Sequence, residues 1–532
     1  MFKLLCFGGL LLLFSAGRVL AESSERVVNG EFEDGFKGWR VTGDVHLQTN
    51  SPLVGRASAI IGPGAGSLTQ RIETGSGNDF TVSALIQSES SHDWLFFLRF
   101  LDQQGQELMR VDSSSDMERS KEDSRKINHF MKAHPLTKWI EIVVSKTSAD
   151  GVVLVDQVGL DMSDENAASL KPVCDLDQAM QPLWVGNKVV NESVLMLSKD
   201  GQPACGQLMF HPSRIISVRD YGLLTNYAEG VDYTVKGRAL VRTASSHLTG
   251  VRDEDLLKGE LKWNNIGGKQ VMVTYEHEDT WEHPKPSFLG DGLPNTMRRL
   301  KAHAPLAVVA YGDSITHGVG ESRLSHVAPF EPPWPELFVH RLGKIYQDEQ
   351  IQLFNSAQSG ATSKWGKQYA ARMVASLNPD LVLIAFGQND FWGISADSFA
   401  ENVADIIKTV RDKRSQAEFL LVSTMRFDPA YTTNSQYWKV VGEYAAKLKA
   451  MTGRGVQFVD MTGLSESIYA DKKPLDCLND PLHPNDYLAR WYAQSVAAAL
   501  DPASASASVS FIKRSEKRGV AGFGPNNSDV AQ

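Results

Sequence analysis

The strongest constraint on the fold is an alternation of strand and helix patterns that begins near residue 304. Short apolar runs predict strands, and the longer segments between them, with apolar residues at helical spacing, predict helices. Strands joined by helices in this way form a mostly parallel sheet with helices on both faces. The expected strands are 305–311, 351–355, 381–386, 419–424 and 456–460, and the expected helices are 334–346, 365–377, 398–412, 436–451 and 487–500.

Four short polar blocks stand where expected strands end or where the last helix begins. They are Gly312-Asp313-Ser314, Asn355 to Gly360, Gly387 to Asp390, and Asp480 to His483. Ligands of open α/β sheets bind beyond the carboxyl ends of the strands, so we expect these blocks to meet at one edge. A serine in a tight turn after a strand presents its hydroxyl there, although this turn lacks the G-x-S-x-G sequence of α/β-hydrolases.

In this order and at these places, the four blocks resemble those of the SGNH (GDSL-type) hydrolase superfamily. The resemblance covers roughly the last 200 residues, about the size of one domain, and gives a hydrolase domain of residues 300–500. It implies an α/β three-layer domain with a mostly parallel sheet and the activity of a carboxylic-ester hydrolase. The implied chemistry requires no cofactor and no metal.

The resemblance also implies a role for each matching residue. Ser314 would be the nucleophile and His483 the general base, while Asp480, three residues earlier, would fix the imidazole tautomer. The oxyanion of the tetrahedral intermediate would be met by the backbone N–H groups of Ser314 and Gly360 and by the side-chain amide of Asn389. Glycine allows a backbone to approach a ligand closely, and an amide donates a hydrogen bond without bringing a charge.

Two further histidines lie near the expected nucleophile in the sequence. His317 and His326 are rival candidates for the general base. Neither has an acidic neighbour placed as Asp480 is placed relative to His483, so we favour His483. Asp313 is expected to brace the turn by hydrogen bonds rather than to react.

Four aromatic residues close to these blocks are candidates for binding a sugar substrate. They are Trp365, Phe391, Trp392 and Tyr487. Aromatic rings beside a catalytic serine can stack on sugar faces. The alternative for each of them is ordinary packing in the core.

Residues 22–165 have the pattern of an all-β domain. Runs rich in β-branched and aromatic residues at 81–88, 94–100, 139–144 and 152–158, with turn signals between them, predict a β-sandwich. The opening, Val28 to Trp39, and the closing strand 154–158 resemble carbohydrate-binding-module-like jelly rolls. This resemblance implies sugar binding through aromatic faces such as that of Trp94, with core packing of that ring as the alternative.

Residues 175–290 predict a second small β-domain, because turn signals separate short apolar runs such as 214–218 and 270–275. His277 and His283 do not have the H-E-x-x-H spacing of a helical zinc pair, and we expect no metal site. The polar remainder, 501–532, predicts a disordered tail.

The first 21 residues predict a signal peptide: Lys3 precedes an apolar run, and Val19-Leu20-Ala21 offers a cleavage site. The run is shorter than the roughly 20 apolar residues that a bilayer requires, so we expect export without a transmembrane span. Cleavage leaves three cysteines. We expect Cys174 and Cys205 to pair and Cys477 to stay free, with three reduced thiols as the alternative.

The formal net charge of −9 gives no reason to expect nucleic acid or an anionic membrane as a partner. The leading hypothesis is a secreted or periplasmic serine esterase that removes O-acetyl groups from polysaccharide or oligosaccharide. A lipase or acyl-thioesterase of the same superfamily, an acetyltransferase and a non-catalytic glycan-binding surface protein are the alternatives.

Overall fold

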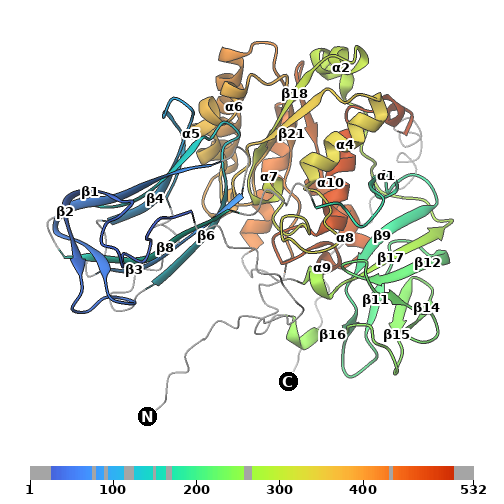
Figure 1. Ribbon diagram of the computed structural model, residues 1–532. Coiled ribbons are helices and arrows are strands. Elements are labelled where there is room, and N and C mark those ends of the chain that lie inside the picture. The colour runs from blue at the N-terminus through green and yellow to red at the C-terminus, as the bar shows by residue number, and fades with distance from the viewer. Residues whose placement is uncertain are drawn as a thin grey trace, which may run out of the picture. The chain divides into compact units, whose positions relative to one another are not determined.

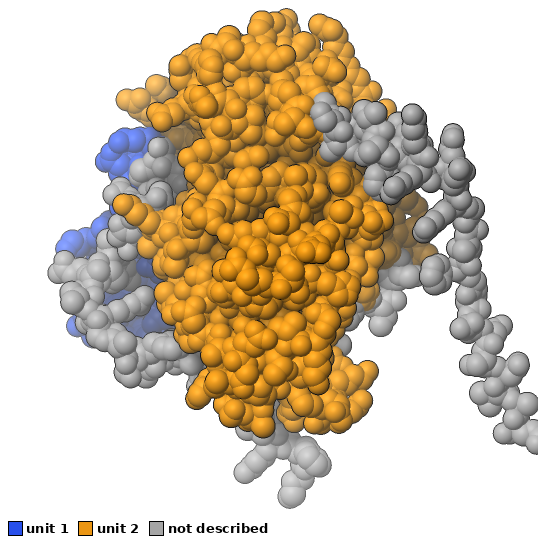
Figure 2. Space-filling model, turned by 90° about the vertical axis from the view of Figure 1, so that its right-hand side faces the viewer, with its two compact units in different colours: residues 1–101, 110–130, 138–163 blue, residues 102–109, 131–137, 164–532 orange. Residues whose placement is uncertain are grey.

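The computed structural model describes residues 26–74, 79–88, 94–112, 125–147, 151–162, 170–256, 266–429 and 435–507. They belong to two compact units, coloured separately in Figure 2: residues up to 101 with 110–130 and 138–163, and residues 102–109, 131–137 and 164 onward. The expected signal peptide and the tail beyond residue 507 lie outside the described residues. Among the helices of the described ranges, none has the length and apolar character needed to cross a bilayer.

The first unit is built on an eight-stranded sheet. Its strands are β1 (Arg40–Gln48), β2 (Ser58–Glu73), β3 (Asp79–Ser88), β4 (Trp94–Leu101), β5 (Glu107–Asp112), β6 (Arg125–Lys132), β7 (Trp139–Lys146) and β8 (Val153–Met162). The order is β5-β4-β7-β2-β8-β3-β6, and β1 pairs with β2. The long strand β2 pairs antiparallel with β8 through 59–61 and with β7 through 66–73, so it links the two halves of the sheet.

Burial of apolar side chains explains why these segments are strands: it alternates in β3, where Phe80, Val82 and Ile86 are buried, and is nearly continuous in β4 and β7. In β4 and β7, large apolar side chains such as Phe96, Phe100 and Ile142 are fully buried, as expected for the inner face of a β-domain. The predicted β-domain is therefore confirmed, and its strands form one continuous sheet path rather than two separate sheets. Trp94 is half-buried at the start of β4.

The second unit contains two small β-sheets. One has the order β14-β15-β11-β10-β16 and the other β13-β12-β17-β9. Their strands are β9 (Lys188–Val194), β10 (Leu197–Ser198), β11 (Cys205–Gln207), β12 (Pro212–Asp220), β13 (Asn226–Tyr227), β14 (Tyr233–Lys236), β15 (Ala239–Arg242), β16 (Val251–Arg252) and β17 (Val271–His277). The predicted strands at 214–218 and 270–275 correspond to β12 and β17. His277 lies within β17, where its ring stacks on Phe210.

The same unit contains a five-stranded, wholly parallel sheet in the order β19-β18-β20-β21-β22. Its strands are β18 (Leu306–Gly312), β19 (Ile351–Asn355), β20 (Leu381–Ala385), β21 (Glu418–Val422) and β22 (Val456–Val459). The predicted α/β sheet is thus confirmed strand by strand. β18, the first strand of this sheet along the chain, lies between β19 and β20, so the loops that follow these three strands leave the sheet side by side.

Helices cover both faces of this sheet. They are α2 (Pro294–Lys301), α3 (Ser314–His317), α4 (Trp334–Tyr346), α5 (Ser363–Met373), α6 (Ala396–Lys413), α7 (Ser435–Ala450), α8 (Met461–Asp471), α9 (Pro474–Cys477) and α10 (Asp486–Ala498), and the short α1 (Leu176–Ala179) precedes the small sheets. Figure 1 shows α5 and α6 on one side of β18 and β21, and α4 and α10 on the other. Residues 502–507 of the expected tail form a 3-10 helix.

The parallel sheet and the small sheets share one hydrophobic core. Buried residues of β9, β17, β18 and α10, among them Val194, Val273, Val308 and Trp491, belong to a single cluster. The expected domain boundary near residue 290 therefore lies inside one compact unit.

The expected bridge between Cys174 and Cys205 is wrong: Cys174, Cys205 and Cys477 are all free. The Cys174 thiol donates a hydrogen bond to the Glu331 carboxylate, whereas Cys205 is exposed in β11. Cys477 is buried in the shared core. Nearness in the sequence is a poor guide to pairing, because a disulfide needs a specific distance between two Cα atoms.

Candidate active site

The site is built around the turn that follows β18. Ser314 is the first residue of the short helix α3, and Asp313 caps that helix. One Asp313 oxygen accepts a hydrogen bond from the Ile315 N–H at 3.1 Å, and the other accepts one from the Gln388 N–H at 3.2 Å. Asp313 thus braces the turn and ties it to the loop after β20, as expected from the sequence.

Ser314 faces a histidine from the far end of the chain. Its hydroxyl oxygen lies 2.8 Å from Nε2 of His483. Nδ1 of the same imidazole lies 2.8 Å from one carboxylate oxygen of Asp480 and 3.1 Å from the other. The three residues therefore form a continuous chain of hydrogen bonds in the order expected of a catalytic triad.

A tight turn holds the histidine and the aspartate together. The N–H groups of Leu482 and His483 both donate to the Asp480 carboxylate, at 2.8 and 3.0 Å. The Asn479 N–H donates to the His483 carbonyl at 2.9 Å and closes the turn. The three-residue spacing of Asp480 and His483 is thus explained by a carboxylate that caps its own turn and also reaches the imidazole.

Two expected oxyanion donors lie in the loops after β19 and β20. Gly360 has φ +75°, a left-handed conformation that favours glycine, and a side chain built there would meet open space. The Asn389 amide donates one hydrogen bond to the Ala361 carbonyl at 3.0 Å, which links the two loops. That bond uses one of the two amide hydrogens, and the second can serve a ligand.

Two buried carboxylates of these loops, Asp313 and Asp390, have raised pKa values. Burial raises the pKa of Asp313 to about 7, although the N–H groups of Gln388 and Ile315 favour its ionised form. Burial also raises the pKa of Asp390 to about 6, against hydrogen bonds from Ser363. Both groups are supports rather than reacting groups, because their oxygens are already used by neighbouring donors.

The rival histidines lie elsewhere. His317 is buried, and its Nδ1 lies 3.0 Å from the hydroxyl oxygen of Ser359 rather than beside Ser314. His326 is exposed in a loop with φ +52°. The structure therefore brings His483, and neither rival, to Ser314 as a hydrogen-bond partner.

Of the four aromatic residues expected to bind substrate, only Trp392 is well exposed, at 53%. Phe391 is buried and stacks on Phe427, so its expected substrate contact is replaced by packing. Tyr487 is likewise buried, below the Arg490 guanidinium, and its expected role is corrected in the same way. Trp365 is half-buried and packs against Tyr311 and Tyr369.

Sequence reasoning missed two residues of this region. Tyr437 in α7 packs edge-on against Trp392, with ring centroids 4.9 Å apart. Gln388 contacts the turn that carries His483: its side-chain amide donates to the Leu482 carbonyl at 3.1 Å. The only signal for Gln388 was its place beside Asn389, and nothing in the sequence indicated a partner so far along the chain.

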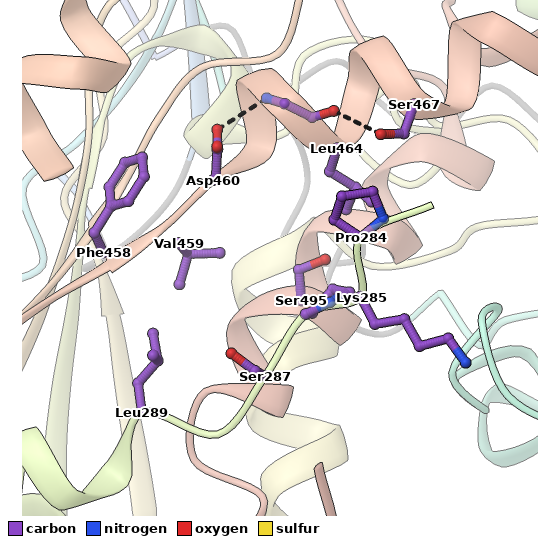
Figure 3. Close-up of a pocket in the computed structure, with 12 residues that line it drawn as sticks. Pro284, Lys285, Ser287, Leu289, Phe458, Val459, Asp460, Leu464, Ser467 and Ser495 are labelled. Carbon is purple, nitrogen blue, oxygen red and sulfur yellow. Dashed lines mark hydrogen bonds between the residues drawn. The ribbon is translucent and has the colours of Figure 1, made fainter. Parts of the chain in front are cut away.

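A separate cavity of about 220 Å³ lies between the segment 284–289 and helix α8 (Figure 3). Two of its polar side chains, those of Asp460 and Ser467, form hydrogen bonds to the backbone of α8. Asp460 accepts a hydrogen bond from the Gly463 N–H at 2.8 Å, and the Ser467 hydroxyl donates to the Gly463 carbonyl at 3.0 Å. This cavity contains none of the residues of the Ser314 site. In the described ranges, no group of three or more His, Cys, Asp or Glu residues is arranged to hold a metal ion.

GDSL-type ester hydrolases have this architecture: a parallel sheet that carries at its carboxyl edge a serine, an asparagine side-chain amide and an Asp-x-x-His turn. Residues 310–491 match the model of the GDSL-like lipase/acylhydrolase family. The chain thus contains a domain of that family, and it is an esterase or acylhydrolase of GDSL type.

Known proteins resemble parts of the chain. An arylesterase of Vibrio mimicus is 26% identical over 194 residues, which cover 36% of this chain and 87% of that protein. An acetyl-xylooligosaccharide esterase from Geobacillus is 17% identical, with a TM-score of 0.31, over 37% of this chain and 94% of that one. The module TmCBM61, solved with β-1,4-galactotriose, is 22% identical, with a TM-score of 0.21, over 26% and 98% respectively.

Proposed function

We propose that this protein is an exported serine esterase that removes O-acetyl groups from polysaccharide or oligosaccharide. One observation carries the chemical part of the proposal. The Ser314 hydroxyl, the His483 imidazole and the Asp480 carboxylate form one chain of hydrogen bonds, with 2.8 Å between Ser314 and His483. Export rests on the leader pattern of the first 21 residues.

In the acylation step, Ser314 attacks the ester carbonyl while Nε2 of His483 takes its proton. Asp480 holds Nδ1 in the protonated tautomer and stabilises the imidazolium that forms. His483 then returns the proton to the leaving sugar hydroxyl, which leaves an acetyl group on Ser314. Water, deprotonated by His483, attacks this acyl-enzyme, and acetate departs as the Ser314 hydroxyl is restored.

The negative charge of each tetrahedral intermediate falls on the former carbonyl oxygen. In the proposed mechanism, the N–H groups of Ser314 and Gly360 and the free amide hydrogen of Asn389 donate to that oxygen. Donors fixed before the reaction stabilise the transition state more than the ground state. The positive φ of Gly360 and the bond between Asn389 and Ala361 hold two of these donors in place.

The choice of a carbohydrate substrate is supported by an exposed aromatic ring beside the expected oxyanion donor. Trp392 follows Asn389 by three residues, lies on the 3-10 turn Asp390–Trp392, and is held from one side by Tyr437. A rigid, exposed indole presents an apolar face that can cover one face of a sugar ring. Tryptophan is enriched at binding interfaces, because it combines a large apolar ring with a polar N–H group.

The direct test is acetate release from a panel of acetylated polysaccharides and oligosaccharides, measured for the parent protein and for Ser314→Ala. The proposal expects release by the parent and none by the variant. A profile on aryl esters of increasing acyl length separates the alternatives: acetyl esters should be hydrolysed fastest. A preference for octanoyl or longer esters, with no release from any glycan, would replace this substrate by a lipid or an acyl thioester.

Two other outcomes would change the proposal further. Acetyl transfer that outruns hydrolysis when acceptor sugar is added would identify an acetyltransferase. A parent protein that binds glycans but neither hydrolyses esters nor reacts with a serine-directed fluorophosphonate would be a binding protein.

A further inference from the structure

Gln388 is a buried residue that makes three hydrogen bonds to three different segments of the site. It is 3% exposed in the loop after β20. Its backbone N–H donates to Asp313 at 3.2 Å, and its side-chain N–H donates to the Leu482 carbonyl at 3.1 Å. Its side-chain oxygen accepts a hydrogen bond from the Thr424 hydroxyl at 2.8 Å.

The bond to Leu482 acts on the peptide group that joins Leu482 to His483. The carbonyl of this peptide accepts from Gln388, and its N–H, which belongs to His483, donates to the Asp480 carboxylate at 3.0 Å. The plane of the peptide is therefore held at both ends. Because hydrogen bonds in a series polarise one another, the bond from Gln388 strengthens the contact to Asp480.

The bond to Asp313 acts on the other half of the site. Asp313 caps the turn of Ser314 through the Ile315 N–H, and its second oxygen is held by the Gln388 backbone. Gln388 thus joins the turn of the nucleophile directly to the turn of the base. The next residue, Asn389, is the expected oxyanion donor, so the same short loop also carries the third part of the site.

The Leu482 carbonyl, which can only accept a hydrogen bond, fixes which way the Gln388 amide points, and the Thr424 hydroxyl serves the other end of the amide. Thr424 follows β21 and is buried, and its hydroxyl donates to the Gln388 oxygen. The amide nitrogen must therefore face Leu482, where a carbonyl requires a donor. Only a side chain with an acceptor and a donor on one planar group meets both demands. Ionised glutamate lacks the donor, and methionine lacks the donor and the strong acceptor.

We propose that Gln388 is a positioning residue that sets the distance between Ser314 and His483 by holding the Leu482–His483 peptide. Its role rests on the proposed function, since it acts through the triad and does not itself touch the substrate. Misplacement of reacting groups by about 1 Å can cost about 100-fold in rate, so the loss of this bond should be seen in the chemical step.

The test compares two variants of Gln388. Gln388→Met keeps the length of the side chain and removes both side-chain hydrogen bonds. Gln388→Glu keeps the acceptor for Thr424 and loses the donor to Leu482. Thr424→Val and Thr424→Ser form a matched pair, since only the serine retains the hydroxyl. For each full-length variant, kcat and KM on an aryl acetate, the rate of fluorophosphonate labelling of Ser314, and the melting temperature are measured.

We expect both Gln388 variants to lower kcat and the labelling rate by about 10- to 100-fold, with KM changed by less than about threefold. Thr424→Val should lower both rates less, Thr424→Ser should retain them, and the double variant Gln388→Met/Thr424→Val should be no worse than Gln388→Met. A folded Gln388→Met protein with unchanged kcat and labelling, or a loss confined to KM, would overturn the assignment.

Labelling separates this proposal from the proposed function. If the parent reacts with the probe but releases no acetate from any glycan, the substrate is wrong and the role of Gln388 is still decided by the variants. If the parent does not react with the probe at all, both proposals fail. If Gln388→Met does not fold, Gln388→Glu and the Thr424 pair decide the matter by the same measurements.

Discussion

The hydroxyl oxygen of Ser314 lies 2.8 Å from Nε2 of His483, although the two residues are 169 positions apart in the chain. Ser314 follows β18, which lies between β19 and β20 in the parallel sheet, and His483 lies in the turn before α10. The parallel sheet makes this meeting possible, because the loops at the carboxyl ends of its strands share one edge.

His483→Ala should lower kcat by about 1,000-fold or more, because Ser314 then has no base to take its proton. The matched control is His326→Asn, which removes an exposed histidine while asparagine tolerates the left-handed backbone at that position. The control should keep kcat within about threefold of the parent. Equal losses in the two variants would show that the assignment of the base is wrong.

Asn389→Ala should lower kcat by about 100- to 1,000-fold, since one donor to the oxyanion is lost. Asn389→Asp, which keeps the shape of the side chain but not the donor, should be about as slow. Steady-state kinetics on an aryl acetate give both values. If Asn389→Asp retained the parent's rate, the amide hydrogen would have no part in the chemistry.

Trp392→Ala should raise KM for an acetylated oligosaccharide by about fivefold, about the contribution of one aromatic contact, and leave KM for an aryl acetate unchanged. Because Trp392 is 53% exposed, its loss should barely change the melting temperature. Tyr487→Ala is the contrast: a large buried ring is removed, and the free energy of unfolding should fall by about 3–5 kcal/mol. A Trp392 variant that weakens both substrates equally would argue against a sugar-binding surface.

The pKa of Asp313 predicts how stability depends on pH. Burial raises this pKa from 3.8 to about 7 in the folded protein, so the folded state binds the proton more tightly than the unfolded state does. The contribution of Asp313 to stability is therefore largest at low pH and is lost as the pH rises from about 4 to about 7.

Asp313→Asn removes this titration. The free energy of unfolding, measured by denaturant titration across the same range, should fall less steeply with rising pH in the variant than in the parent. The variant should also be less stable at low pH, since asparagine cannot accept both hydrogen bonds that Asp313 accepts. Parallel pH profiles for the two proteins would contradict the assignment.

Much of the α/β fold could be predicted from local patterns alone. Helix α4 begins and ends where expected, and each strand of the parallel sheet lies within one or two residues of its predicted range. The reason is physical: strands buried on both faces are continuous apolar runs, and the helices that cover them are apolar on one face. The polar blocks between them predict Ser314, Asp480 and His483 as a candidate triad, and the structure joins these three side chains in one chain of hydrogen bonds.

What the sequence could not supply were contacts that depend on tertiary packing. Tyr487 follows His483 closely, yet α10 is buried on all sides, so nearness in the sequence did not mean nearness to substrate. The partners of Gln388 and of Cys174 lie 94 and 157 positions away in the chain. No local pattern encodes such pairs, because they depend on how loops and sheets pack.

The most direct test of Ser314 as the nucleophile is to react the intact protein with a fluorophosphonate and to find the modified residue by mass spectrometry of its peptides. We expect the phosphonyl group to be attached to Ser314, and we expect Ser314→Ala and His483→Ala not to be labelled under the same conditions. Labelling of Ser359, whose hydroxyl lies 3.0 Å from His317, or no labelling of the parent, would contradict it.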